Sequence, residues 1–468
     1  MTPARPLIEQ LTPAPAPWEL AQAVAALPHM LFLDSAGGPP HLARYSYLAA
    51  DPFAWLCVGG DDPENPFDLL ARALAGWRAE RVPDAPPFQG GAAGLFGYGL
   101  ARWLERLPRP RIDEFRGPEL AVGFYDWVIA WDHHDRRAFI ISTGFPETDE
   151  PARSERARMR LEAVQHLVRH PDRLFRPMAQ PPPRVEPAVL HPLPVRPLVF
   201  SNFDPASYLT AVRRAVEYIH AGDCFQVNLS QRLLAPIGAP AIELYGQLRK
   251  CNPAPYSGYF DLGDFQIVSA SPEQFLGLRA DGFVVTRPIK GTRPRAPDPR
   301  ADRGLAVDLL ASAKDRAENV MIVDLLRNDL GRVCAYGSVG VQNLCELQTF
   351  PTVHHLVSTV QGRLRLGLGA VDLLKAAFPG GSVTGAPKVR AMEIIAELEP
   401  TARGPYCGSL AWLGFDGAMD SNILIRTFTA GGGWLQFPVG GGIVADSDPQ
   451  REYEETLHKA AGLLRALE

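Results

Sequence analysis

The sequence lacks several features that would assign it to a specialised class of protein. Its six cysteines are scattered without a Cys-x-x-Cys spacing, so neither a zinc motif nor a disulfide framework is indicated. No apolar run of about 20 residues occurs, and the first residues lack the apolar core of a secretory signal. The net charge is −5, and no basic run indicates a nucleic-acid surface. We therefore expect a cytoplasmic protein that binds neither membranes nor nucleic acid.

The chain has 468 residues, 46% of them hydrophobic, which is enough for a large core without metals or disulfides. Eight prolines between Arg176 and Val199 predict an extended connector over residues 176–198, separating a first region, 1–175, from a second, 199–468. Strand patterns at 30–34, 120–131 and 138–142 and an amphipathic helix over 150–170 occur in the first region. Helices such as 204–220 alternate with strands such as 225–233 in the second. Strands and long helices at irregular spacing predict a layered α+β fold.

Lys290 is the residue with the most informative surroundings. It lies in Pro288-Ile-Lys-Gly-Thr292, directly after an apolar stretch, 282–286, that is typical of a strand. We expect the lysine where this strand runs into a Gly-Thr turn. An amine held there partly out of water can lose its proton and act as a nucleophile. A lone lysine is more often a solvated surface residue, so its neighbours must decide.

Carboxylates supply the next signal. Asp315 and Glu318, and again Glu452 and Glu455, have i, i+3 spacing and so share a helix face. Such pairs are usually solvated helix starts, but two pairs facing one cavity would suit magnesium, which takes few carboxylates. Glu273 follows the strand pattern 265–270. It is either a surface carboxylate or a general acid that apolar neighbours keep protonated.

Three glycine-rich stretches, 90–98, 380–388 and 440–442, do not match nucleotide-binding motifs. The second opens a helix, 388–398, whose N-terminus could face an anion. The third follows a strand and would let backbone N–H groups approach a carboxylate closely. His355 is either a satisfied core histidine or a site residue. Arg426 is either part of a buried ion pair or a bidentate clamp for a carboxylate.

Taken together, these segments resemble the chorismate-utilising enzymes, most closely the component I group of aminodeoxychorismate synthases. The matching stretches are 223–232, 252–256, 271–273, 288–292, 318–329, 382–388, 440–442 and Glu452-x-x-Glu455, with weaker matches at 33–35, 44–46 and 90–98. The resemblance implies a chorismate-binding fold of layered antiparallel sheets flanked by helices. It also implies that the N-terminal and catalytic portions are interwoven.

Two positions distinguish between the reactions that members of this family catalyse. Relatives that add water to chorismate carry a lysine base where this chain has Gln226, and anthranilate synthases typically have alanine where it has Lys290. The resemblance thus implies amination of chorismate by ammonia to 4-amino-4-deoxychorismate, a step of p-aminobenzoate and folate biosynthesis, through a covalent Lys290 intermediate. The alternatives are an anthranilate synthase component I, which makes anthranilate and pyruvate, and a non-catalytic amino-acid-sensing homologue.

The resemblance also implies a role for each site residue. Lys290 would be the nucleophile and Glu273 the acid, with Mg²⁺ on Glu318 and Glu455 and with Asp315 and Glu452 behind them. The substrate residues would be Gly291, Thr292 and His355 around the ring and Tyr406, Arg426, Lys459, Gly440, Gly441 and Gly442 at the enolpyruvyl carboxylate. A candidate tryptophan pocket comprises Ser35, Arg44, Tyr45, Asn252, Pro253 and Tyr256. The chain has no glutaminase motif, so a glutamine amidotransferase partner is implied as the source of ammonia.

Overall fold

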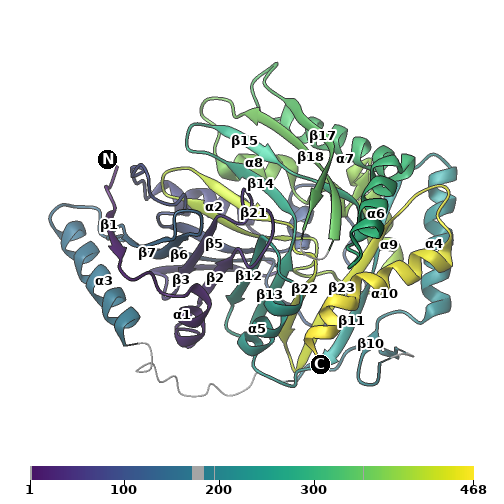
Figure 1. Cartoon of the computed structure of the whole chain (residues 1–468), viewed down its shortest axis with the longest axis horizontal. Coiled ribbons are helices and arrows are strands. Elements are labelled where there is room, and N and C mark those ends of the chain that lie inside the picture. Colours follow the sequence, from purple (N-terminus) through teal and green to yellow (C-terminus); the bar gives the residue numbers. More distant parts are fainter. Residues whose placement is uncertain (1–2, 171–183, 194–195, 351–352) are drawn as a thin grey trace.

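The computed structural model describes residues 3–170, 184–193, 196–350 and 353–468. In this part of the chain, two large antiparallel sheets lie between helices (Figure 1). Of the predicted connector, residues 176–183 and 194–195 lie outside the described residues. The remaining connector residues are joined to the larger sheet, since the Val185 N–H donates to Gly432 O and the Trp434 indole donates to Val185 O.

The larger sheet has thirteen strands within the described residues. In spatial order they are β1 (Leu7–Leu11), β8 (Arg137–Ser142), β7 (Trp127–Asp132), β3 (Tyr45–Ala49), β2 (Leu31–Asp34), β12 (Tyr256–Asp261), β13 (Phe265–Ser271), β22 (Thr427–Gly431), β23 (Trp434–Ile443), β11 (Gln226–Pro236), β10 (Phe200–Ser201) and β9 (His191–Pro192), with β19 (Gly385–Ala386) paired to β11. Strands from both regions of the sequence therefore share one sheet, and the predicted interweaving is confirmed.

The smaller sheet has ten strands in the same part of the chain. Their order is β16 (Ile289–Pro294), β18 (Val353–Arg363), β15 (Phe283–Thr286), β14 (Gln274–Leu278), β21 (Met419–Asn422), β20 (Ser409–Gly414), β5 (Gly91–Phe96), β6 (Leu120–Tyr125) and β4 (Ala54–Val58), with β17 (Gly340–Thr349) paired to β18. This sheet also combines both regions, because β5 pairs with β20.

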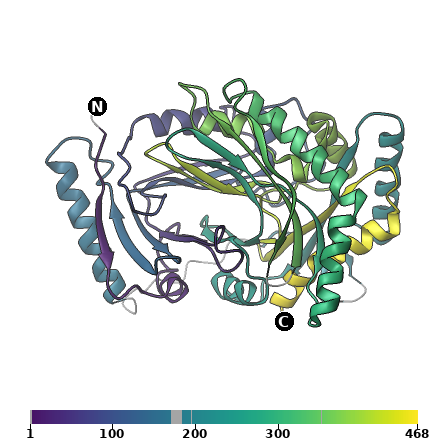
Figure 2. The same cartoon turned by 45° about the horizontal axis from the view of Figure 1, so that its top comes forward.

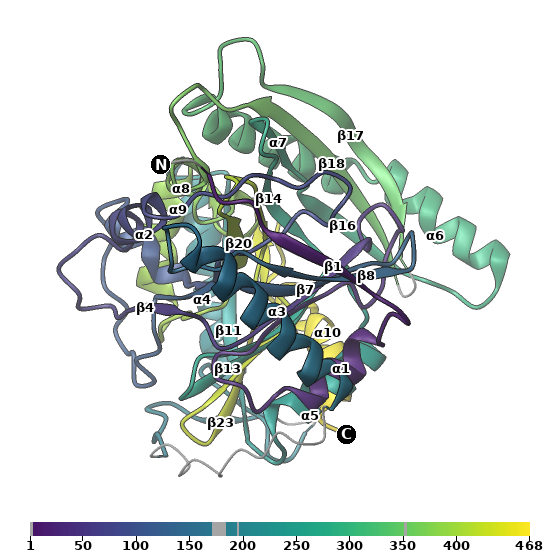
Figure 3. The ribbon, with the colours of Figure 1, turned by 90° about the vertical axis from the view of Figure 1, so that its left-hand side faces the viewer.

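Ten α-helices and two 3₁₀ segments complete the described chain. They are α1 (Pro17–Ala23), α2 (Pro66–Ala75), η1 (Tyr98–Trp103), α3 (Ala152–Arg169), α4 (Pro205–His220), α5 (Ala241–Cys251), α6 (Pro299–Ala311), α7 (Ala313–Gly331), α8 (Ala370–Ala377), η3 (Gly381–Val383), α9 (Lys388–Leu398) and α10 (Pro449–Ala466). Helix α3 lies across β1 and β8 (Figure 3), at the end of the molecule opposite α6 and α7 (Figure 2). No helix among the described residues is long and apolar enough to span a membrane.

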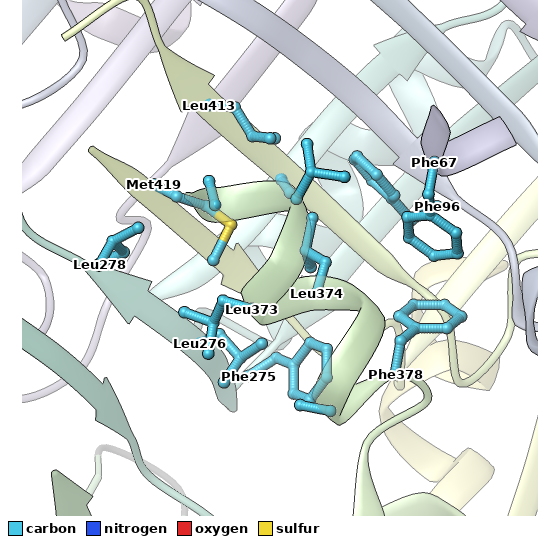
Figure 4. Packing of buried hydrophobic residues seen from close by; sticks show 14 of the residues in the cluster. Phe67, Phe96, Phe275, Leu276, Leu278, Leu373, Leu374, Phe378, Leu413 and Met419 are labelled. Atoms are coloured by element: carbon cyan, nitrogen blue, oxygen red, sulfur yellow. The ribbon is translucent and has the colours of Figure 1, made fainter. Parts of the chain in front are cut away.

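Three hydrophobic clusters define four layers. Tyr47 and Val128 of the larger sheet pack against Leu95 and Trp412 of the smaller one, so the two sheets meet face to face. The outer face of the larger sheet is buried by apolar side chains of α1, α3, α5 and α10. The outer face of the smaller sheet is buried by α2 and α8, and Figure 4 shows Leu373 and Leu374 of α8 among the side chains of its strands. The predicted layered α+β fold is confirmed.

The main chain crosses from one sheet to the other at several points. One crossing is Asp126, so the strand pattern 120–131, expected as a single strand, is two strands, β6 and β7, in different sheets. Periodicity could not reveal this break, because both strands are apolar except for Asp132 and are buried on both faces. Two further crossings lie at Pro272–Glu273, between β13 and β14, and at residues 423–426, between β21 and β22. Two predicted site residues, Glu273 and Arg426, therefore lie where strands leave the larger sheet.

Candidate active site

Lys290 lies at a β-bulge rather than at the predicted turn. It belongs to β16, where Ile289 pairs with Val357 and Thr292 pairs with His355, so two residues of β16 face one residue of β18. Gly291 has φ +87°, which supplies the left-handed conformation that such a bulge favours. The turn was predicted because Gly-Thr ends a strand pattern, but pairing with the distant β18 continues the strand. A bulge re-aims the side chain beside it.

Burial lowers the pKa of Lys290 from its ordinary value. The nearby Glu318, Glu273 and Glu455 carboxylates oppose this shift, whereas the Lys459 ammonium adds to it. The amine is therefore easier to deprotonate than a solvated lysine, while carboxylates from three other segments surround it. This is the environment expected of a nucleophilic lysine.

Glu273 is 4% exposed, and burial raises its pKa to about 7. Ser382 and Lys290 act in the opposite direction, and the Ser382 Oγ–H donates to Glu273 Oε1 at 2.7 Å. The surface-carboxylate interpretation is wrong for this residue. A carboxyl with a pKa near neutrality can donate a proton at physiological pH, as a general acid must.

His355 and Arg426 lie beside the bulge. The Thr292 hydroxyl and His355 Nδ1 share a hydrogen bond of 2.8 Å, and burial together with the Arg426 charge lowers the pKa of His355 to about 3. The imidazole is thus neutral, and its Nε2 is buried without a hydrogen-bond partner in the described chain. Arg426 has φ +51° and forms no ion pair with any described residue, so its buried-pair interpretation is not supported. Burial lowers the pKa of its guanidinium.

The three glycines were expected to follow a strand, but they lie inside β23. Gly440, Gly441 and Gly442 pair with β11 on one side, whereas on the other side β22 pairs only with residues 434–436 of the strand. In the described chain this edge of the glycine run therefore has no strand partner. Lys459 on α10 donates to Gly440 O at 2.9 Å and pairs with Glu455 at 2.7 Å.

The four predicted metal-site carboxylates come from α7 and α10. Burial raises the pKa of Glu318, and Glu455 adds to that effect. Burial also acts to raise the pKa of Glu455, but the ammonium groups of Lys459, Lys314 and Lys290 together outweigh it, so the pKa is lowered. Glu452 accepts from Ser447 at 2.6 Å, and Asp315 pairs with Arg293 at 3.0 Å. Glu318 thus has no hydrogen-bond or ion-pair partner among the described residues, whereas Glu455 shares an ion pair with Lys459.

Tyr406 is buried, at 5% exposure. Its ring packs in the cluster under the smaller sheet, 5.7 Å from the Arg403 guanidinium. Arg403 is itself buried and binds both oxygens of Glu399, at 2.8 and 2.6 Å. The contacts of Tyr406 in this structure are thus with a structural ion pair.

Four of the six residues predicted for a tryptophan pocket, Ser35, Arg44, Tyr45 and Tyr256, line one cavity of about 1170 Å³ between the sheets. Asn252 and Pro253 are not in its wall. Asn252 is buried beside Gly462, and Pro253 packs against Gly37. The opposite wall was not predicted and includes Gln274 and Asp420 of the smaller sheet and Arg287, which lies between β15 and β16. Their contribution depends on how the sheets stack, which no local pattern signals.

Two further residues at the site were missed or only partly understood. Ser382, which contacts Glu273, lies in the glycine-rich stretch 380–388, which was weighed as a phosphate loop or an anion-facing helix start and matched to the family without a role for this serine. In that stretch Lys388, at the start of α9, forms a buried ion pair with Asp329 at 2.6 Å. Gln226 is fully buried, and neither atom of its amide has a partner among the described residues. An ideal Cβ on Gly442 would lie 2.9 Å from Gln226 Nε2, so this amide abuts the glycine run.

The two sheets, the partly buried lysine, the buried acid and the carboxylate pairs are the features that a related protein should share. Residues 43–465 match the family model described as chorismate binding enzyme, and the chain belongs to that family. It is 42% identical over 456 residues to the aminodeoxychorismate synthase component 1 of Salmonella typhimurium, covering 94% of each chain. It is also 45% identical over 390 residues to the anthranilate synthase component 1 of Thermus thermophilus, covering 83% of this chain and 80% of that one.

Solved structures give the same result for the fold. Anthranilate synthase component I from Streptococcus pneumoniae has a TM-score of 0.76 at 33% identity, over 90% of this chain and 92% of that one. The menaquinone-specific isochorismate synthase of Escherichia coli shares the fold with a TM-score of 0.71 at 20% identity, over 100% of this chain and 96% of that one. The family and fold predicted from the sequence are confirmed, and the chain is a chorismate-utilising enzyme.

Proposed function

We propose that this chain is the chorismate-aminating component of an aminodeoxychorismate synthase, which makes 4-amino-4-deoxychorismate for p-aminobenzoate and folate biosynthesis. The observation that carries the proposal is Lys290 at the bulge of β16. Its amine has a lowered pKa and shares its surroundings with Glu273, whose carboxyl is half protonated near pH 7. A nucleophile and an acid of this kind serve a reaction in which one group leaves as another adds.

In the first step Glu273 donates its proton to the C4 hydroxyl of chorismate. The neutral Lys290 amine forms a bond to C2, the electrons of the ring diene shift toward C4, and the C4–O bond breaks with loss of water. Lys290 is then a substituted ammonium and Glu273 a carboxylate. The proton makes a good leaving group of a poor one, which is the usual contribution of a general acid.

In the second step ammonia forms a bond to C4, the diene electrons shift back, and the C2–N bond to Lys290 breaks. Lys290 leaves as a neutral amine because its adduct was the ammonium form. The new C4 ammonium returns one proton to the Glu273 carboxylate, which restores the starting state. One difficult displacement is thus divided into two easier ones.

Mg²⁺ is part of the proposal. Glu318 and Glu455 would hold it, and their charges fit such an ion because Glu455 raises the pKa of Glu318, so the two carboxylates repel each other. Among the described residues no group of three or more His, Cys, Asp or Glu side chains gathers, so water or substrate oxygens would have to supply the other ligands of the ion. When bound, the ion would neutralise the ring carboxylate of chorismate.

The remaining residues would position the substrate. Thr292, Gly291 and the neutral His355 would line the ring, because they flank Lys290 on β16 and β18. Arg426 would bind the enolpyruvyl carboxylate with Lys459 and the open edge of the glycine run. A guanidinium without an ion pair is suited to a bidentate carboxylate contact. Tyr406 would act from behind this site.

Two further ligands belong to the proposal. Ammonia would come from a glutamine amidotransferase subunit, and the name component 1 of the relatives supports a second component. The cavity lined by Ser35, Arg44, Tyr45 and Tyr256 would bind tryptophan, since it combines aromatic rings with an arginine. Calorimetry with tryptophan, and with Ser35→Trp as the control that fills the cavity, would test the second ligand. Binding unaltered by the substitution would place the amino acid elsewhere.

A second candidate is anthranilate synthase component I, which the Thermus thermophilus relative favours through its 45% identity. Incubation with chorismate, Mg²⁺ and an ammonium salt separates the two. We expect an aminated product that keeps the enolpyruvyl group, whereas release of anthranilate and pyruvate would refute the proposal.

The covalent step has its own test. Lys290→Ala should lose C4 amination by roughly 10²–10⁴-fold while its unfolding temperature stays unchanged. Lys375→Ala, which removes an amine paired with Asp68 on the surface, is the matched control and should keep full activity. Mass spectrometry of wild-type protein quenched with chorismate but without ammonia should show an adduct on the peptide that contains Lys290. Full amination by the Lys290→Ala protein would show that the adduct is dispensable.

A further inference from the structure

The two oxygens of the Glu273 carboxyl have different surroundings. Oε1 accepts from the Ser382 hydroxyl at 2.7 Å and lies 3.5 Å from the Ile289 N–H. Oε2 receives no hydrogen bond from any described residue. A carboxylic acid carries its proton on one oxygen only, and an oxygen that already accepts from a donor is the poorer place for it. The surroundings therefore favour the acid form with the proton on Oε2.

We propose that Ser382 is a positioning residue that directs the acidic proton of Glu273 onto Oε2 and aims it at the leaving hydroxyl. This inference rests on the proposed function, in which Glu273 is the acid. With the Ser382 hydroxyl on Oε1, the carboxyl cannot exchange its two oxygens by rotation without breaking a buried hydrogen bond. The proton is thus held on the oxygen that no other group occupies.

The turn that carries Ser382 is held from several sides. The Arg403 guanidinium donates to Val383 O at 3.0 Å, and the Thr384 hydroxyl donates to Gly380 O at 3.1 Å. The N–H of Asn228 on β11 donates to Thr384 O at 2.8 Å, which ties the same turn to the larger sheet. These contacts hold the backbone of the turn and so fix the Ser382 side chain beside the acid. The Arg403–Glu399 ion pair therefore supports the site indirectly, by holding the turn that carries Ser382.

Only a few titratable groups face Glu273. The Lys290 ammonium from β16 lowers the pKa of Glu273, and the charge of Glu273 in turn contributes to the raised pKa of the buried Cys407 thiol, before β20. The Ser382 hydrogen bond stabilises the carboxylate as well as orienting the acid. Its removal should therefore raise the pH at which the acid is lost, and lower the rate because the proton is no longer aimed.

Ser382→Ala tests the proposal through the pH profile of ammonia-dependent amination. We expect kcat to fall roughly tenfold or more and the alkaline limb to move up by about one pH unit, with both restored in Ser382→Thr. Thr384→Val is the matched control, because it removes a hydroxyl of the same turn that bonds only backbone, and it should leave the limb where it is. If the alanine protein does not fold, Ser382→Cys keeps the volume with a weak donor and should give a smaller shift of the same sign.

A second variant separates this inference from the proposed function. Glu273→Gln with near wild-type activity would refute the acid itself, whatever Ser382→Ala does. If Glu273→Gln loses at least about 10²-fold but the alkaline limb of Ser382→Ala is unmoved, the acid stands and the role of Ser382 is refuted. A uniform loss at all pH values with a lowered unfolding temperature would likewise assign Ser382 a purely structural role.

Discussion

Gly441→Ala should lower substrate binding and catalysis while leaving the stability of the fold nearly unchanged. An ideal Cβ at this position would lie 3.3 Å from Glu452 Oε2, 3.4 Å from Glu455 Oε1 and 3.7 Å from Lys459 Nζ. All three atoms are ends of side chains, and the backbone of Gly441 is outside the left-handed region, so a small movement of the carboxylates accommodates the methyl. The methyl would nevertheless occupy the space between the carboxylates and the lysine, where the substrate and Mg²⁺ are proposed to bind.

The neighbouring glycine provides the control. A Cβ on Gly440 would lie 2.6 Å from the Leu229 carbonyl oxygen and 2.8 Å from Ser230 Cβ in the paired strand β11. Such overpacking against backbone costs about 1–3 kcal/mol of stability. Gly440→Ala should therefore lower the free energy of unfolding by that amount, whereas Gly441→Ala should change it by less than about 1 kcal/mol.

Gly441→Ala should instead change the catalytic function. One methyl added to a binding site changes discrimination by about 1–3 kcal/mol, or roughly 10–200-fold, so kcat/KM for chorismate should fall by that factor in Gly441→Ala. Urea unfolding, steady-state kinetics and calorimetric titration with Mg²⁺ measure the three quantities. A Gly441→Ala protein with wild-type kcat/KM and Mg²⁺ affinity would show that the glycine run serves only the sheet and would refute the reasoning.

Four other outcomes follow from the geometry. The Arg426→Gln protein should be as stable as the wild type or more stable, because the substitution removes a buried charge without an ion pair. Its KM for chorismate should rise roughly 100-fold, and an unchanged KM would show that Arg426 does not bind the carboxylate. Arg403→Met should lose about 3–5 kcal/mol in urea unfolding by leaving Glu399 buried and unpaired, and a neutral result would mean that the pair is dispensable. Amination should decline as pH rises through about 7, since Glu273 must be protonated and burial raises its pKa to that value; a rate still rising at pH 9 would contradict this. EDTA should abolish amination and Mg²⁺ should restore it, so activity in EDTA would exclude the proposed ion.

The spacing of residues in the sequence was enough to predict those parts of the site that lie on a single helix. Asp315 and Glu318 on α7, and Glu452 and Glu455 on α10, share faces because three residues make nearly one turn. The metal role of Glu318 and Glu455 stays a prediction, and the Arg293 partner of Asp315 was not foreseen. Such predictions succeed because the determining distances are a few residues long.

The surroundings of Lys290 and Glu273 could not be predicted, because they depend on residues that are distant in the sequence. The bulge at Lys290 exists only in register with Val357 and His355, more than 60 residues along the chain. Glu273 is buried because the strand before it and the strand after it belong to different sheets, and its serine partner is supplied by η3. Sequence patterns identify such residues as candidates, but pairing between distant strands decides their pKa and direction.

The bulge also explains why fold and reaction can vary separately in this family. The geometry at position 290 is maintained by its neighbours, because Gly291 supplies the positive φ and Ile289 and Thr292 keep the pairing with β18. An alanine in place of Lys290, typical of the anthranilate synthases that this stretch resembles, would leave all of these contacts intact. Under the proposed function, one side chain on an unchanged bulge would decide whether a covalent lysine route exists, which agrees with aminodeoxychorismate and anthranilate synthase relatives that resemble this chain to a similar degree, at 42% and 45% identity. On this proposal the residue at position 290, more than overall similarity, would indicate the product.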